Sequence, residues 1–237
     1  MTAPSIKFCG VTRAQDAELA VSLGAWAVGM ILWPGSPRAV TPDQAVELAA
    51  AIGRGAERVG VFYNQTLQEV AAVADAAGLT ILQMHGQEGP VFCAEAARRT
   101  GCRVIKAARV QIGADVHALA PFHTDFHLLD SYVPGIPGGT GETFAWDLAA
   151  DYRRLVPRQR GAAPVPLILS GGLRPGNVGA AIAAVAPFAV DVASGVESAP
   201  GVKDHGLMRE FVAAVADSAA PRGEFVAPGA TNSPRPA

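Results

Sequence analysis

Short apolar runs alternate with Ala-rich segments of helical period along most of the chain. The apolar runs are rich in Val, Ile, Leu and Phe and predict strands at 5–9, 26–32, 58–63, 80–84, 103–108, 125–130, 166–170 and 188–193. The segments between them predict helices over 14–23, 42–52, 66–77, 90–100, 112–119, 145–154, 175–185 and 203–217. Residues of a helix-capping type precede several of these helices, namely Thr12, Thr41 and Thr66, and Pro42 suits a first helical turn.

Eight strand-then-helix units indicate parallel strands joined by right-handed crossovers. An open doubly wound sheet would usually show G-x-G-x-x-G at the first turn, whereas this turn reads Cys9-Gly10-Val11-Thr12. Eight is also the number of strands that closes a TIM barrel. We therefore predict a single-domain α/β protein, a (β/α)8 TIM barrel over 1–217, followed by a Pro- and Gly-rich disordered tail over 218–237.

Composition narrows the possible partners. The 237 residues are 50% hydrophobic, with 19 Lys+Arg against 21 Asp+Glu and no basic block, which argues against nucleic acid or an anionic membrane as a partner. The three cysteines form no C-x-x-C pair, and no secretory signal begins the chain. We expect a soluble cytoplasmic monomer or homodimer that binds a small molecule and needs no metal or other cofactor.

Catalytic groups of such barrels lie where the strands end. The residues at or just after the predicted strand ends are mostly reactive or anion-binding types: Cys9, Arg38, His85, Asp130, Gly171, Gly172, Ser194 and Gly195. The small residues after strands 7 and 8 let backbone N–H groups approach an anion, and 194–197 suits the short extra helix that binds phosphate in many barrels. Tight turns alone would also explain one such glycine pair, but two adjacent small-residue turns favour a phosphate site.

Cys9 and Asp130 suggest a base and an acid. A thiol at the barrel mouth acts as a base if positive charge favours its thiolate. Lys7, two residues back, either supplies that charge or pairs with the inward-pointing Asp191, and we favour the pair. Asp130 ends an apolar strand, and a carboxyl group at an apolar rim tends to have a raised pKa that suits general-acid work. The alternative for Asp130 is a helix cap or a loop contact.

Two further side chains suit substrate binding. Arg38 lies in a turn-rich loop where its guanidinium can hold a carboxylate through two parallel hydrogen bonds, unless it is a solvated loop residue. His85 either orients the substrate or is a structural histidine with satisfied hydrogen bonds. The Gly-rich stretch 134–141 after strand 6 is typical of a mobile lid.

At these positions the chain resembles the phosphoribosylanthranilate isomerase family of tryptophan biosynthesis. Nine ordered blocks carry the resemblance: Lys7–Thr12 (KFCGVT), Ser36–Arg38 (SPR), Val59–Asn64 (VGVFYN), Gln83–Gly86 (QMHG), Leu128–Ser131 (LLDS), Gly138–Gly141 (GGTG), Ser170–Leu173 (SGGL), Asp191–Glu197 (DVASGVE) and Pro200–Asp204 (PGVKD). Among the departures from the family pattern, Ala193 stands where a serine is common and removes one hydroxyl near the expected phosphate.

The resemblance implies a metal-free, cofactor-free Amadori rearrangement of a phosphosugar. Asp130 then looks like the acid that opens the furanose ring, and Cys9 looks like the base that removes the C2′ proton. Arg38 would hold the anthranilate carboxylate, and Gly171, Gly172, Ser194 and Gly195 would hold the phosphate, under a lid that closes after strand 6.

Other phosphosugar barrels remain as alternatives. Histidine-pathway isomerases use two strand-end aspartates, and indole-glycerol-phosphate synthases need lysine and glutamate pairs, of which this chain has few. A Schiff-base aldolase would need a lysine in the mouth, for which Lys106 is the candidate. A non-catalytic phosphosugar-binding protein would keep the glycine turns but would not need Cys9 and Asp130 together.

Overall fold

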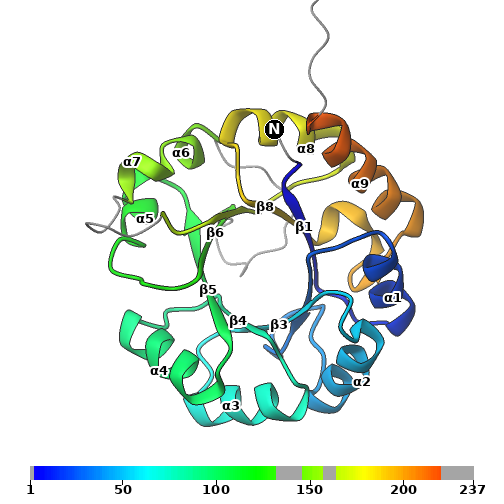
Figure 1. Ribbon diagram of the computed structural model, residues 1–237, viewed down its shortest axis with the longest axis vertical. Coiled ribbons are helices and arrows are strands. Elements are labelled where there is room, and N and C mark those ends of the chain that lie inside the picture. Colours follow the sequence, from blue (N-terminus) through cyan, green and yellow to red (C-terminus); the bar gives the residue numbers. More distant parts are fainter. Residues whose placement is uncertain (1–2, 132–145, 157–163, 220–237) are drawn as a thin grey trace, which may run out of the picture.

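A closed barrel of eight parallel strands forms the centre of the computed structural model, which describes residues 3–131, 146–156 and 164–219. Each strand pairs with the next, and β8 pairs with β1 to close the ring (Figure 1). The strands are β1 (Ser5–Cys9), β2 (Ala27–Ile31), β3 (Glu57–Phe62), β4 (Ile81–Met84), β5 (Arg103–Val110), β6 (Phe126–Ser131), β7 (Leu167–Leu169) and β8 (Ala189–Val192). The predicted TIM barrel is therefore confirmed.

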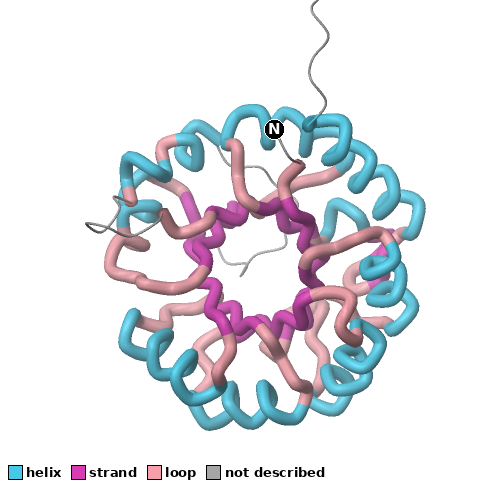
Figure 2. Tube along the Cα trace, viewed as in Figure 1, coloured by secondary structure: helices cyan, strands magenta, loops and turns pink. Residues whose placement is uncertain are grey.

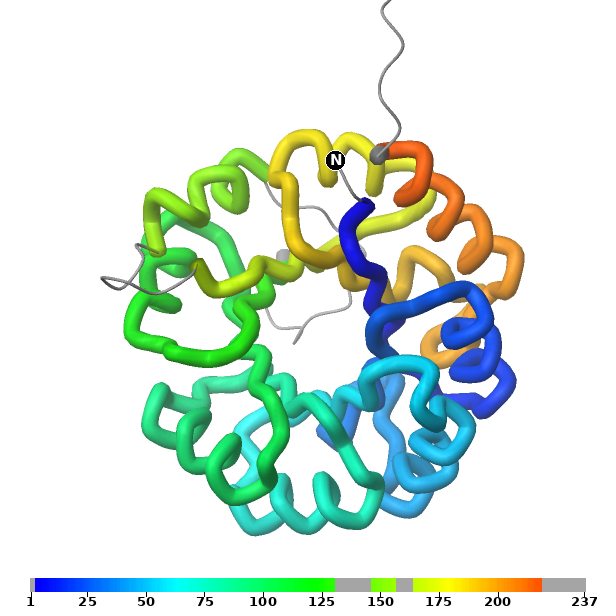
Figure 3. The backbone as a smooth tube through the Cα atoms, in the orientation of Figure 1, coloured from blue at the N-terminus to red at the C-terminus, as the bar shows by residue number. Residues whose placement is uncertain are grey.

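Helices surround this ring on the outside, as the cyan segments of Figure 2 show. They are α1 (Ala14–Ser22), α2 (Pro42–Ile52), α3 (Leu67–Ala76), α4 (Pro90–Thr100), α5 (Gly113–His117), α6 (Trp146–Ala150), α7 (Tyr152–Leu155), α8 (Pro175–Val185) and α9 (His205–Ala219). The Thr41 and Thr66 side chains accept hydrogen bonds from the backbone of the first turns of α2 and α3, as predicted. The path of the chain in Figure 3 brings the last helix back beside the first.

Three local features differ from the sequence prediction. Thr12 does not cap α1, because its hydroxyl donates instead to the Gly201 carbonyl at 2.5 Å. The predicted helix 145–154 is two short helices that meet at Asp151, whose carboxylate binds Arg154. A two-stranded antiparallel hairpin, β9 (Glu197–Ala199) and β10 (Val202–Lys203), was not predicted and follows the 3-10 turn η1 (Ser194–Val196).

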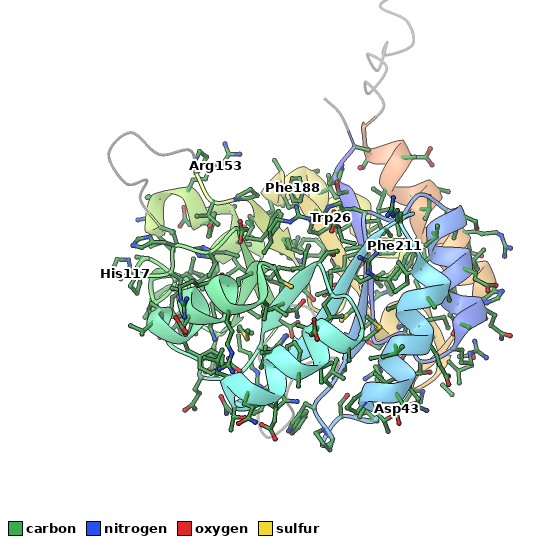
Figure 4. All side chains as sticks on the ribbon, turned by 60° about the horizontal axis from the view of Figure 1, so that its bottom comes forward. Trp26, Asp43, His117, Arg153, Phe188 and Phe211 are labelled. Carbon is green, nitrogen blue, oxygen red and sulfur yellow. The ribbon has the colours of Figure 1, made fainter. Side chains whose placement is uncertain are left out.

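Successive side chains along each strand point alternately into and out of the barrel, which creates two apolar layers. Inward residues such as Val59, Ile81, Ile105, Leu128 and Ile168 fill the barrel, while the outward residues pack under the helices. At the N-terminal end of the strands, the Trp26, Phe126 and Phe188 rings pack against one another with centroids 5.1–5.5 Å apart. Figure 4 shows Trp26 and Phe188 on the side of the molecule away from Asp43, at the start of α2. The aromatic cluster closes one end of the barrel, so a ligand must enter from the other.

Candidate active site

A pocket opens at the C-terminal end of the strands. Its described lining comes from the inward rows and the loops that follow them: Cys9, Ile31, Trp33, Ser36, Arg38, Val61, Tyr63, Gln83, His85, Asp130, Ser170, Gly171, Gly172, Leu173, Asp191, Ala193 and Ser194. The structure thus brings together seven of the eight predicted site residues. Gly195, the eighth, lies one position beyond the lining, within η1. The predicted lid, residues 134–141, lies outside the described residues.

Cys9 lies beside a buried ion pair in the barrel interior. Lys7 Nζ is 2.8 Å from Asp191 Oδ1, and the Ser170 hydroxyl donates to Asp191 Oδ2 at 3.2 Å. The favoured pairing of Lys7 with Asp191 is therefore confirmed. Burial raises the pKa of the Cys9 thiol, although the positive charges of Lys7 and Lys203 act in the opposite direction. The thiol therefore keeps its proton to higher pH than an exposed cysteine does.

Asp130 lies inside the pocket beside His85 and is 3% exposed. His85 Nε2 is 3.3 Å from Asp130 Oδ2, although this contact lacks hydrogen-bond geometry. His85 Nδ1 is 2.9 Å from Gln83 Nε2. If the amide nitrogen donates here, Nδ1 is the acceptor and the ring proton sits on Nε2, facing the carboxylate. Gln83, which sequence analysis did not single out, thereby orients the histidine.

Arg38 reaches the pocket with one edge of its guanidinium already engaged. Its Nε and Nη2 donate to the Glu197 carboxylate at 2.7–3.0 Å, and both side chains are buried. The two-bond carboxylate contact expected of Arg38 is thus made within the protein, and Nη1 remains for a ligand. Burial alone would raise the pKa of Glu197, but Arg38 and Lys203 outweigh it and hold the pKa below its ordinary value.

Lys203, which the sequence analysis names only within the Pro200–Asp204 block and to which it gives no role, connects three groups beside the pocket. From β10, its Nζ donates to the Cys9 carbonyl at 2.6 Å, the Ala193 carbonyl at 3.0 Å and the Glu197 carboxylate at 2.8 Å. It therefore joins the ends of β1 and β8 to the Arg38 pair. The sequence signal that could have found Lys203 is the rarity of lysine. The chain has three lysines, and all three are buried in the structure.

The turns after β7 and β8 have the backbone that the predicted phosphate site requires. Gly171 and Gly172 have φ values of +92° and +63°, a region that side chains rarely adopt. A Cβ on Gly195 would lie 1.8 Å from the Leu173 carbonyl oxygen, so only glycine fits there. Ser194 begins the predicted extra turn, here η1. Gly171, Gly172 and Ser194 are among the residues that line the pocket.

Lys106, the candidate Schiff-base lysine, lies on the outward row of β5. Its Nζ donates to the Gly86 carbonyl at 2.7 Å and to Glu88 at 3.2 Å, so it supports the loop after His85 from behind. No lysine occurs in the described lining of the pocket. This placement removes the feature on which the aldolase alternative depended.

Comparisons with known proteins agree with this site. A family model described as N-(5′-phosphoribosyl)anthranilate (PRA) isomerase matches residues 6–214. The N-(5′-phosphoribosyl)anthranilate isomerase of Azotobacter vinelandii is 45% identical over 214 residues, which cover 90% of this chain and 97% of that protein.

Solved structures agree as well. The crystal structure of phosphoribosyl anthranilate isomerase from Thermotoga maritima has a TM-score of 0.78 and 37% identity, covering 90% of this chain and 98% of that one. A second structure, of a phosphoribosyl anthranilate isomerase in complex with reduced 1-(o-carboxyphenylamino)-1-deoxyribulose 5-phosphate, has a TM-score of 0.75 and 35% identity with the same coverage. The chain therefore belongs to the phosphoribosylanthranilate isomerase family.

Proposed function

We propose that Cys9 is the general base and Asp130 the general acid of the isomerase reaction. This reaction of tryptophan biosynthesis converts N-(5-phosphoribosyl)anthranilate into 1-(2-carboxyphenylamino)-1-deoxyribulose 5-phosphate. The observation that carries the assignment is that a thiol on β1 and a carboxyl group on β6 line one pocket at the C-terminal end of the barrel. The reaction needs one proton delivered to the sugar and one removed from it, which these two groups can do.

The first step is ring opening. Asp130 gives its proton to the ring oxygen of the furanose, the bond between C1′ and that oxygen breaks, and the nitrogen lone pair forms a C1′=N iminium. His85 lies beside the Asp130 carboxylate, where its Nε2–H stabilises the charge that develops on proton loss. His85 is thus a substrate-site residue that positions the acid.

The second step is proton removal at C2′. The iminium withdraws electrons and makes the C2′ proton acidic, so that the thiolate of Cys9 can take it without help from a metal ion. The electron pair of the C–H bond forms the C1′=C2′ bond, and the iminium nitrogen recovers its lone pair. The resulting enolamine tautomerises to the ketone. The positive charges of Lys7 and Lys203 stabilise the thiolate and partly offset the effect of burial, which favours the neutral thiol.

Backbone amides and one guanidinium hold the two ends of the substrate in this proposal. The N–H groups of Gly171, Gly172, Ser194 and Gly195 bind the phosphate, with no cationic side chain required. Arg38 Nη1 donates to the anthranilate carboxylate. The substrate is the small-molecule partner of the protein, and we expect catalysis in the cytoplasm, where the buried free cysteines stay reduced.

The assignment is tested by the loss of substrate fluorescence in the presence of EDTA. We expect turnover by the wild type and a fall in kcat of at least about 10²-fold, with a smaller change in KM, for Cys9→Ala and for Asp130→Ala. Cys93→Ala, which removes a buried thiol of α4 outside the pocket, is the matched control. A near-wild-type kcat in either active-site variant would remove that residue from the mechanism, and no turnover by the wild type would refute the metal-free reaction.

A further inference from the structure

One buried carboxylate holds the two loops that follow β3 and β4. Glu88 Oε1 accepts a hydrogen bond from the Asn64 backbone N–H at 2.7 Å, and Oε2 accepts one from the Gly86 backbone N–H at 2.9 Å. Asn64 belongs to the loop over 63–66, whereas Gly86 and Glu88 belong to the loop over 85–89. The Glu88 side chain is buried, so these bonds are made away from solvent, where an unpaired polar group is costly.

Lys106 supplies the opposite charge for this carboxylate. Its Nζ lies 3.2 Å from Glu88 Oε2 and donates to the Gly86 carbonyl at 2.7 Å. Both backbone polar groups of Gly86 are therefore bonded, the N–H to Glu88 and the carbonyl to Lys106. Neither charged side chain lies in the described lining of the pocket. The pair can therefore act on the reaction only through the loops that it holds.

The two loops also contact each other directly. The Asn64 side-chain oxygen accepts a hydrogen bond from the Gln87 N–H at 2.6 Å. A Cβ on Gly86 would clash with that same oxygen, so glycine is required for this close approach. Asn64 has a φ of +58°, a left-handed conformation that asparagine adopts more readily than most residues. The loops therefore form one packed unit, and Glu88 bonds to the backbone of both.

Each of the two loops begins with a side chain that lines the pocket, Tyr63 in one and His85 in the other. Glu88 holds the backbone one residue beyond each of them. His85 Nε2 lies 3.3 Å from Asp130 Oδ2, and this contact depends on the orientation of the ring because it is made at the far end of the side chain. Movement of the loop backbone would therefore displace His85 from Asp130.

We propose that Glu88 is a positioning residue, which fixes His85 beside Asp130 by holding the loop over 85–89 against the loop over 63–66. This inference rests on the proposed function, because it takes Asp130 to be the acid that His85 assists. Lys106 belongs to the same unit, since its ammonium compensates the buried charge of Glu88. The lysine that the sequence offers for a Schiff base thus serves the acid through Glu88 and does not touch the substrate.

Kinetics of Glu88→Gln in two backgrounds test the proposal. The glutamine oxygen can accept from one of the two N–H groups, but its NH2 group cannot accept from the other. In otherwise wild-type protein kcat should fall about 10-fold, because the ring of His85 is displaced. In a His85→Asn background the same substitution should change kcat by less than about 2-fold, since the group through which it acts is gone. A wild-type kcat in Glu88→Gln, or the same loss in both backgrounds, would overturn the positioning role.

The ring ¹⁵N NMR signals of His85 give a second readout that needs no substrate. These signals are identified by their disappearance in His85→Asn, and they should move in Glu88→Gln. Glu57→Gln is the matched control, because Glu57 also pairs with a basic side chain, Arg103 at 2.7 Å, but begins β3 at the opposite end of the barrel. The control should lower Tm without changing kcat or the His85 signals. His85 signals that stay in place in Glu88→Gln would also overturn the proposal.

Glu88→Asp provides a second variant if Glu88→Gln does not fold. It keeps the negative charge beside Lys106, but its carboxylate is one methylene shorter and cannot reach both N–H groups. The fall in kcat, its dependence on His85 and the movement of the His85 signals should all recur in this variant.

The acid assignment can fail separately. If Asp130→Ala keeps a wild-type kcat, the proposed acid is wrong, whereas the ring signals of His85 still decide whether Glu88 positions that side chain. If Asp130→Ala is inactive while Glu88→Gln leaves both kcat and the His85 signals unchanged, this inference alone is refuted.

Discussion

The Lys203 ammonium donates a hydrogen bond to the backbone carbonyl of Cys9, with 2.6 Å between nitrogen and oxygen. Lys203 belongs to the small hairpin outside the barrel, whereas Cys9 ends the first strand. The same ammonium also binds the Ala193 carbonyl and the Glu197 carboxylate. One buried charge therefore connects the backbone of Cys9, the turn after β8 and the Arg38 pair.

Replacing Lys203 with methionine should destabilise the protein and slow catalysis. The change leaves Glu197 with Arg38 alone and leaves the Cys9 and Ala193 carbonyls without this donor, and loss of one partner from a buried ion pair costs about 3–5 kcal/mol. Denaturant unfolding and steady-state kinetics measure the two effects. Because Lys203 and Glu197 share one network, Lys203→Met combined with Glu197→Gln should cost less than the sum of the single changes. Additive losses would show that the two side chains act independently.

The pH dependence of kcat/KM should report the raised pKa of the Cys9 thiol. In the proposed mechanism the active form has Cys9 as the thiolate and Asp130 protonated, which is one proton for the two groups. The form with no proton on either group is inactive, so kcat/KM falls at high pH when the pair loses that last proton. Burial raises the pKa of Cys9 above its reference value of 9.0, against the opposing charges of Lys7 and Lys203 and with Asp191 adding to the rise. The alkaline fall in kcat/KM should therefore begin above about pH 9.

Thiolate absorbance gives an independent measurement of that ionisation. In a Cys93→Ala, Cys102→Ala background, the titrating thiol is Cys9, and its midpoint should coincide with the alkaline limb of the rate profile. Cys9→Ser should abolish the absorbance change. An alkaline limb at or below about pH 8, or a thiol that ionises there, would contradict the dominance of burial.

Hydrophobic periodicity was sufficient to predict the barrel because each strand is buried on both faces and each helix on one. The prediction of strand bounds failed where a strand continues through polar residues beyond its apolar run. β5 continues to Val110, two residues beyond its apolar run, because the polar Arg109 follows Ile105 and Ala107 on the inward side of the strand.

Candidate site residues were predictable from their position at strand ends, but their partners were not. Arg38 and Glu197 are 159 residues apart, and nothing local in either segment indicates that they meet. The same holds for Thr12, whose local sequence predicts a helix cap. In the structure the hairpin brings the Gly201 carbonyl close, and the Thr12 hydroxyl donates to that carbonyl instead. Tertiary contacts decide between such alternatives because they satisfy the same donor in a different way.

His127 should make the protein less stable in mild acid. Burial lowers the pKa of His127 from 6.5 to about 4. Its Nε2 is 3.1 Å from the Phe122 carbonyl oxygen, and its Nδ1 is 2.8 Å from the Tyr152 hydroxyl. Since the folded pKa lies below the unfolded one, the unfolded state binds more protons as pH falls from about 6.5 to 4, and stability falls by up to about 3 kcal/mol. Denaturant unfolding of wild type and His127→Phe at pH 7.5 and 4.5 measures this difference. The variant should lose less stability on acidification, and equal losses would exclude His127 as a source.

Gly29→Ala should impair catalysis through Cys9. A Cβ at position 29 would lie 3.0 Å from Cys9 Sγ and 3.2 Å from Lys7 Nζ, so the thiol would have to move within a packed barrel. Small displacements of a reacting group cost much rate, and we expect kcat to fall at least about 10-fold. Gly179→Ala on α8 is the matched control, because no atom outside its chain neighbours and the nearby backbone of its own helix lies within 4 Å of the added methyl group. This control should keep wild-type kcat and gain about 0.5–1 kcal/mol of stability from the better helix former. A wild-type kcat in Gly29→Ala would show that the position of the thiol is not critical and would weaken its assignment as the base.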